Sequence, residues 1–274
     1  MIARLFSKPT RYGCNVMLAT AVAWLFCGLS GQAATFHWIA NPVDEYWGTT
    51  GNWDTGTAPN ASDADVFFTA SAITTVDIDL HASQYSDRSV RSIVFNGSDS
   101  FTLRYGGVIY LKNSSGILVQ PGSPGQTFNV EVRPTIGGSH DFNIVNNGSG
   151  TLAFDRNINA SPGCNATVIF DGTGGITISK LIRRHATQTT NVSLVKNGSG
   201  TLTITDADTR TGNARGDGTS YGAPTGTTTI NAGTIRIDDE ANLGANPGGY
   251  WTWDGSVDTF VPGTFNPAAL TLNG

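Results

Sequence analysis

Short stretches in which apolar and polar residues alternate recur along most of this chain. In Thr201–Ile204 the two threonines face one side while Leu202 and Ile204 face the other, which is the two-residue period of a β-strand. The same alternation returns in residues 227–237, on both sides of an Asn-containing corner. The 3.6-residue period of a helix is almost absent. The pattern therefore predicts an all-β protein.

An internal repeat organises these strands. Residues 93–103 (IVFNGSDSFTL), 144–154 (IVNNGSGTLAF) and 194–204 (LVKNGSGTLTI) align without gaps at offsets of 51 and 50 residues. Between the two strands of each copy lies a corner, which we interpret as a sharp turn because Asn and Gly tolerate a positive φ. The predicted corner residues are Asn96, Gly97, Asn147, Gly148, Gly150, Asn197, Gly198, Gly200, Asn231 and Gly233.

The repeat favours a right-handed parallel β-helix, also called a β-solenoid. A strand with about two inward apolar side chains cannot bury a core alone, so each unit must stack on its neighbours. Coils of roughly 20–25 residues would make the repeat two coils long. The alternative is an antiparallel β-sandwich, in which Asn-Gly would close hairpins. We prefer the β-helix because the repeat keeps the same side-chain types at the same register.

The first 33 residues read as a signal peptide. Residues 1–12 carry three basic side chains and no acidic one, and Val16–Leu29 is an apolar run of 14 residues. A membrane span needs about 20 residues, so a short membrane anchor is the weaker alternative. Small residues at Gly31 and Ala33 predict cleavage after Ala33, with cleavage after Ala34 as the second choice. The chain is therefore expected to be exported.

Composition narrows the function classes. Only 14% of residues are charged, the net charge is −5 and the pI is about 5.2, which excludes a coiled coil and argues against nucleic-acid binding. Cys164 is the one cysteine outside the predicted signal peptide, so an intrachain disulfide is not expected after cleavage. No motif for a cofactor appears, and we expect none.

Residues 194–244 resemble one autotransporter-associated β-strand repeat. The matching positions are Lys196, Gly198, Gly200, Thr201 and Leu202 in the first half, and Gly226, Thr228, Asn231, Ala232, Gly233 and Thr234 in the second. Residues 144–154 resemble the first half only. Residues 36–67, with Trp38, Trp47, Asn52, Trp53, Pro59, Asp63 and Asp65, resemble the Trp-rich opening of such passengers.

The resemblance implies a secreted passenger, a β-helical stalk that is exported across the bacterial envelope and displayed or released outside. We expect it to be a non-enzymatic surface stalk or adhesin-like binding module. Proteins of this kind end in a transmembrane barrel, so a C-terminal translocator or anchor is expected downstream of Gly274. Residues 270–274 support this expectation because they restart the repeat without its exit strand. The implied organisation is a Trp-containing cap with the first coils at 34–92, a solenoid at 93–244, and a Gly/Pro/Trp-rich insertion with a truncated repeat at 245–274.

Candidate chemistry is sparse, and we assign no catalytic or metal-binding residue. Asp77 with Asp79, or Asp206 with Asp208, could bind calcium or act as paired carboxylates, Arg210 lying near the second pair. A β-helical polysaccharide lyase or hydrolase is therefore the alternative to a non-enzymatic protein.

Binding is expected on loops held by a stiff scaffold. Residues 212–226 and 247–262 read as long loops, and the second contains three aromatic residues that could stack on the sugar rings of an extracellular glycan: Tyr250, Trp251 and Trp253.

Overall fold

The computed structural model describes residues 33–78, 87–112, 116–134, 138–159, 164–180, 182–183, 192–205, 214–215, 219–220, 227–237, 250–253, 258–261 and 270–272. The chain divides into two compact units, Met1–Ala33 and Ala34–Gly274, and only the second is described below. The predicted signal peptide lies outside the described residues except for Ala33.

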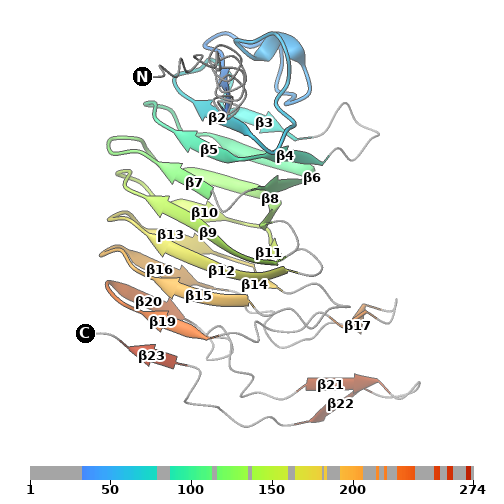
Figure 1. The fold of residues 1–274 in the computed structure, drawn as a ribbon, viewed down its shortest axis with the longest axis vertical. Coiled ribbons are helices and arrows are strands. Elements are labelled where there is room, and N and C mark those ends of the chain that lie inside the picture. Colours follow the sequence, from blue (N-terminus) through green and yellow to red (C-terminus); the bar gives the residue numbers. More distant parts are fainter. Residues whose placement is uncertain are drawn as a thin grey trace, which may run out of the picture. The chain divides into compact units, whose positions relative to one another are not determined.

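Two parallel sheets make up most of the second unit (Figure 1). The first sheet runs β1 (Ala34–Trp38), β2 (Ala64–Phe68), β5 (Ser92–Phe95), β7 (Gly116–Val119), β9 (Gly138–Asn146), β12 (Cys164–Asp171), β15 (Val192–Lys196), β19 (Thr228–Ile230) and β23 (Leu270–Leu272). The second contains β3 (Thr75–Asp77), β4 (Arg88–Val90), β6 (Thr102–Leu111), β8 (Gln126–Pro134), β10 (Leu152–Phe154), β11 (Ile158–Asn159), β13 (Ile176–Ile178), β14 (Ile182–Arg183), β16 (Thr201–Ile204) and β20 (Thr234–Ile237).

Successive coils lie directly under one another. Ile93 pairs with Ile117 after 24 residues, and Ile117 pairs with Ile144 after a further 27. Ile144 pairs with Phe170 after another 26 residues. The sequence repeat therefore spans two coils, as predicted. The β-solenoid is confirmed, and the antiparallel sandwich is wrong for these two sheets because all of their strand pairs are parallel.

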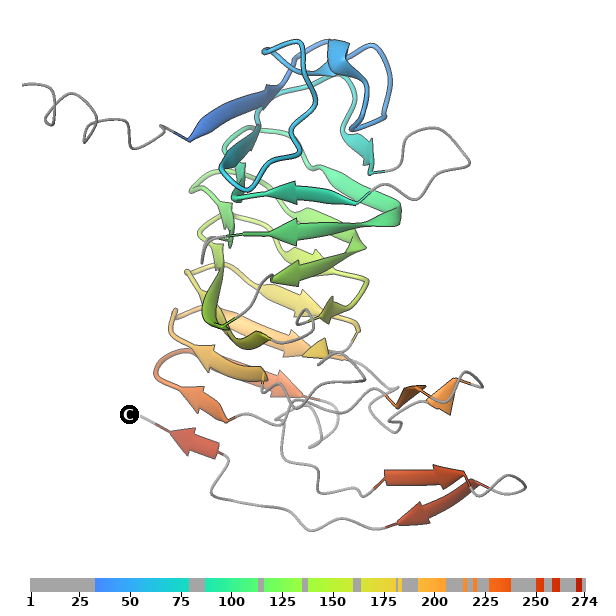
Figure 2. The same ribbon diagram turned by 45° about the vertical axis from the view of Figure 1, so that its right-hand side comes forward.

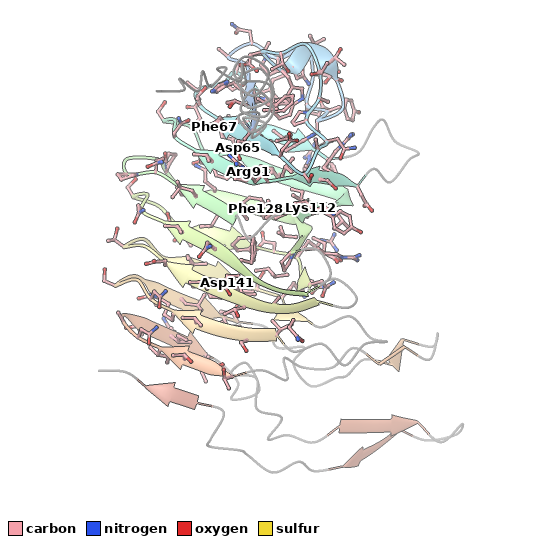
Figure 3. All side chains as sticks on the ribbon, viewed as in Figure 1. Asp65, Phe67, Arg91, Lys112, Phe128 and Asp141 are labelled. Carbon is pink, nitrogen blue, oxygen red and sulfur yellow. The ribbon has the colours of Figure 1, made fainter. Side chains whose placement is uncertain are left out.

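Alternating side chains of each strand fill the space between the sheets (Figure 3). In β16, Leu202 and Ile204 are buried while Thr201 is exposed, as the alternation predicts. Four phenylalanines from successive coils pack along the interior. The ring centroids of the stacked pairs Phe68–Phe95 and Phe128–Phe154 lie 5.2 and 5.1 Å apart, and Phe95 meets Phe128 edge to face at 5.8 Å. Burying each ring contributes about 1.5–3 kcal/mol.

The corner glycines are needed for a different reason from the one the sequence suggested. Of the predicted corner glycines only Gly233 has a positive φ, of 74°, and none of the corner asparagines does. A Cβ on Gly198 would lie 2.1 Å from the carbonyl oxygen of Gly172, and one on Gly150 would lie 2.1 Å from the amide nitrogen of Gly125. Close stacking of backbones between coils, rather than turn conformation, therefore requires glycine at positions 150 and 198.

The register of the second and third repeat copies differs between the sheets. In the second sheet Leu152 pairs with Ile176, which pairs with Leu202, so the 50-residue offset of the sequence is kept. In the first sheet Ile144 pairs with Phe170, which pairs with Lys196, an offset of 52. We predicted that the repeat copies stack in register. The copies at 93–103 and 144–154 do so in both sheets. The copy at 194–204 does so only in its exit strand, β16.

Two antiparallel hairpins leave the last coils, namely β17–β18 (Ala214–Arg215 and Thr219–Ser220) and β21–β22 (Tyr250–Trp253 and Asp258–Val261). Figure 2 shows the first in orange and the second in red. Residues 212–226 and 247–262 are therefore not plain loops, since each contains a hairpin.

Candidate functional site

The three predicted stacking residues lie on the β21–β22 hairpin. The backbone register pairs Trp251 with Phe260 and Trp253 with Asp258. The sequence analysis missed Phe260 because the pairing partner of an aromatic residue is not visible without the register. The side chains of this hairpin lie outside the described part of the structure.

The acidic candidates are only partly described. Asp77 is buried, and its Oδ1 accepts a hydrogen bond from Arg104 Nε at 2.6 Å across neighbouring coils. Its carboxylate is therefore committed to an ion pair. Asp79, Asp206, Asp208 and Arg210 lie outside the described residues. Within the described residues no group of three or more His, Cys, Asp or Glu side chains could hold a metal ion.

The tryptophans near the N-terminus are structural. Trp38, Trp47 and Trp53 are buried in the core, and each indole N–H donates to a backbone carbonyl, of Ile73 at 3.0 Å, Pro59 at 2.9 Å and Trp47 at 2.7 Å, respectively. Buried and hydrogen-bonded indoles cannot stack on a sugar ring.

A bulge in β6 opens a groove that sequence reasoning did not find. Arg104 pairs with Asn129 of β8, and Val108 pairs with Glu131, so three residues of β6 lie opposite one residue of β8. Tyr105 begins the bulge with a φ of 70°, and 54% of its surface is exposed. The sequence signal was Gly106-Gly107 inside a strand, a pattern that often marks a bulge.

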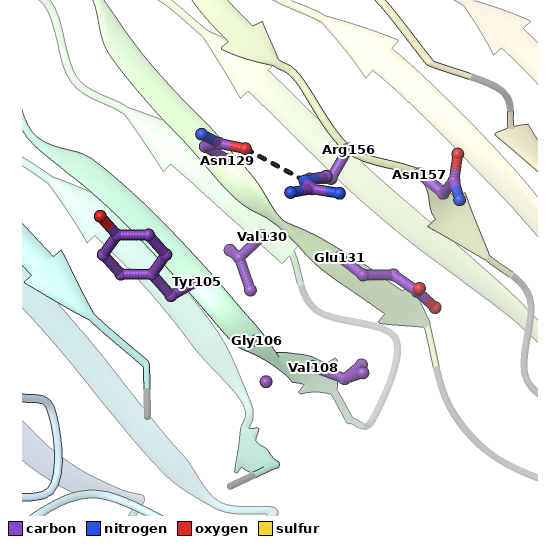
Figure 4. Close-up of a pocket in the computed structure, with 9 residues that line it drawn as sticks. Tyr105, Gly106, Val108, Asn129, Val130, Glu131, Arg156 and Asn157 are labelled. Carbon is purple, nitrogen blue, oxygen red and sulfur yellow. Dashed lines mark hydrogen bonds between the residues drawn. The ribbon is translucent and has the colours of Figure 1, made fainter. Parts of the chain in front are cut away.

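The groove has a volume of about 500 Å³ (Figure 4). Arg156 lies in it and donates from Nε to Oδ1 of Asn129 at 3.1 Å. Glu131 accepts a hydrogen bond from Asn159 Nδ2 at 2.7 Å and forms an ion pair with Arg133. The lining residues are Tyr105, Gly106, Gly107, Val108, Asn129, Val130, Glu131, Arg156 and Asn157.

Charges beside this groove are balanced in pairs. Burial alone would lower the pKa of Arg133, but the hydrogen bond and charge of Glu131 raise that pKa above its ordinary value. The hydrogen bond from Arg104 to Asp77 likewise raises the pKa of Arg104. Burial raises the pKa of Tyr110, whose phenol accepts a hydrogen bond from Arg133 at 3.3 Å. Both arginines are therefore cationic at neutral pH and the tyrosine is neutral.

Comparison with protein-family models, curated proteins and solved structures finds no match to this chain. In the described part of the chain, no helix is long and apolar enough to cross a membrane. The strand pairing described above establishes the fold, and the resemblance to a repeat family rests on the sequence motif alone.

Proposed function

We propose that this chain is an exported, non-enzymatic passenger of the autotransporter-associated repeat type, a β-helical stalk that acts as an adhesin on a glycan or host surface. The observation that supports this best is the stacked parallel solenoid itself. Its inward apolar positions and corner glycines account for the regularities of the sequence, and these regularities need no catalytic role to explain them. A stiff stack of coils is also a suitable scaffold for exposed binding elements.

The buried Trp cluster fits the role of an N-terminal cap. It packs on Phe68 next to β1, the first strand in the order of the nine-stranded sheet. An uncovered end of a solenoid exposes apolar side chains and an open strand edge, both of which favour aggregation. We propose that Trp38, Trp47 and Trp53 cover that end of the core.

Export and display are tested together on intact cells. We expect the exported protein to begin at Ala34, or at Thr35 if cleavage follows Ala34, and to be digested by a protease added outside the cells. N-terminal sequencing and protection from protease measure the two properties. An intact Met1, or complete protection of the protein in cells whose outer membrane is unbroken, would contradict the proposal.

Glycan-array binding beside a turnover assay on acidic polysaccharides with calcium separates an adhesin from the alternative lyase. We expect binding without turnover, and weaker binding by Trp251→Ala because an aromatic ring that could stack on a sugar is lost. Turnover that disappears in Asp206→Ala and Asp208→Ala would instead identify an enzyme.

A further inference from the structure

We propose that the groove at the β6 bulge is a second binding site, one that takes an uncharged saccharide. The choice of ligand class rests on the proposed adhesin function, although the site is distinct from the β21–β22 hairpin.

The backbone of the bulge is strained at Tyr105. A non-glycine residue in the left-handed region costs on the order of 1 kcal/mol and persists where its surroundings impose it. Tyr105 adopts this conformation while remaining more than half exposed, so burial of its ring does not compensate the cost. Bulges of this kind commonly occur beside functional sites, where they re-aim a side chain.

The exposed ring of Tyr105 is held in place. The guanidinium carbon of Arg104 lies 4.4 Å from the ring centroid, and the side chain of Arg104 is itself anchored by Asp77. Arg104 thus covers part of the ring while the rest of it borders the groove. A fixed aromatic ring loses little conformational entropy when a ligand packs on it.

The polar groups of the groove match hydroxyl groups. Asn129, Asn157 and Arg156 present planar amide and guanidinium groups (Figure 4), which can donate two hydrogen bonds in fixed directions. Arg156 uses Nε on Asn129, and its terminal nitrogens have no partner among the residues that the structure describes. They are therefore free to donate to a ligand.

Charge balance favours an uncharged ligand over an anion. Arg104 and Arg133 are each neutralised by an ion pair, with Asp77 and Glu131. Arg156 lies in the groove, and Asp87 accepts a hydrogen bond from the amide of Val108 at 3.1 Å. Lys112 lies over the ring of Tyr110, outside the groove lining. A phosphate or a polyanionic glycan would meet little net positive charge here. The volume of about 500 Å³ falls within the usual range for ligand pockets.

The test is calorimetric titration of the purified exported protein with cellotetraose, maltotetraose, chitotetraose and tetragalacturonate. We expect at least one uncharged tetrasaccharide to bind with a Kd below about 1 mM. Tyr105→Asn should weaken that binding about tenfold, because Asn tolerates the left-handed backbone but supplies no ring. Arg156→Gln should weaken it at least about threefold.

Arg236→Gln is the matched control, since Arg236 is an exposed arginine on β20 outside the groove, and its binding should equal that of the original protein. Three results would overturn the proposal: no binding up to about 10 mM, binding of tetragalacturonate alone, or binding unchanged in both Tyr105→Asn and Arg156→Gln. Binding lost only in Trp251→Ala would support the hairpin and reject the groove. The protease test on cells is independent of all of these results.

Discussion

Lys196 shows how a polar side chain is accommodated inside the solenoid. It is buried, and the sequence repeat aligns it with Asn146 of the preceding copy, although its strand pairing places it in the column of Ile144 and Phe170. Each side chain bonds its own corner, Lys196 Nζ donating to the carbonyl of Gly198 and Asn146 Nδ2 donating to the carbonyl of Gly150 at 2.9 Å. These positions therefore satisfy corner carbonyls that a stack of apolar residues would leave unpaired.

Burial lowers the pKa of Lys196, although the charge of Asp171 partly opposes the shift. Between the folded-state pKa and the unfolded value of about 10.4 the unfolded chain binds more protons, so stability should rise with pH in that window. Lys196→Met removes the titration. We expect the difference in unfolding free energy between the two proteins to change with pH below about 10.4. Urea unfolding at several pH values measures it, and a constant difference would contradict the buried ammonium.

Asp65 links the first two complete coils through Arg91 and Ser92 of the next coil. Burial alone would raise its pKa, but the hydrogen bonds from Arg91 and Ser92 and the charge of Arg91 lower that pKa below the ordinary value. The stability that this carboxylate contributes is present above the unfolded pKa of about 3.9 and is lost as pH falls through the folded-state pKa.

Asp65→Asn should therefore lower the unfolding free energy by about 1–2 kcal/mol at pH 7. This is the usual contribution of a charged hydrogen bond, reduced because Arg91 is partly exposed to solvent. The cost should shrink towards zero in strong acid. Asp141→Asn is the control because Asp141 is exposed. Chemical unfolding across the acid range measures both variants. A cost for Asp65→Asn that stays the same in acid would contradict the assignment.

At the scale of one element, the corner glycines give a paired prediction. Gly198→Ala should cost about 3 kcal/mol or more, because its Cβ would overlap the backbone of Gly172 at 2.1 Å. Gly175→Ala should change stability by less than about 1 kcal/mol, since its Cβ would meet only Thr151 Oγ1 at 3.6 Å. Thermal unfolding compares the two variants. Equal costs would show that the coils are not stacked as closely as described.

The strand pattern was predictable, but the register of one strand was not. Alternation correctly identified Leu202 and Ile204 as inward because the two faces of β16 differ in polarity. The first-sheet register from Ile144 to Lys196 is two residues longer than the sequence repeat. The difference arises at the corner between Phe170 and Ile176, which stacks under the corner that follows Asn146. There Gly172, with a φ of 98°, passes close to the backbone of Asn146. A corner of small and polar residues fits either register, so no local pattern distinguishes them.

The candidate site was predictable only in part, for a similar reason. The aromatic residues of the hairpin were visible in the sequence, whereas their partner Phe260 required the strand register. The groove needs Tyr105, Asn129 and Arg156 to meet from three successive coils. These residues are about one coil apart in the sequence, and their contact can be predicted only when the length of each coil is known.

At the scale of the whole solenoid unit, coil length is the property that varies. Ala166 pairs with Val192 after 26 residues, but Leu194 pairs with Thr228 after 34 and Thr228 with Leu270 after 42. The extra residues hold the two hairpins, while the strands before and after them keep parallel pairing. Insertions are tolerated because lengthening a surface connection adds little to the free-energy cost of closing the loop. The two hairpins are thus additions to a repeated scaffold.

One distance tests the stacked solenoid most directly. Thr75 and Thr203 lie in one outward column of the second sheet, linked through Thr102, Thr127, Ala153 and Thr177. Five coil steps of about 4.8 Å place them about 24 Å apart. Spin labels at these two positions, with Cys14, Cys27 and Cys164 replaced by serine, should give a single narrow distance near that value by pulsed electron resonance. A distance beyond about 35 Å, or no defined distance, would contradict the stack of parallel coils.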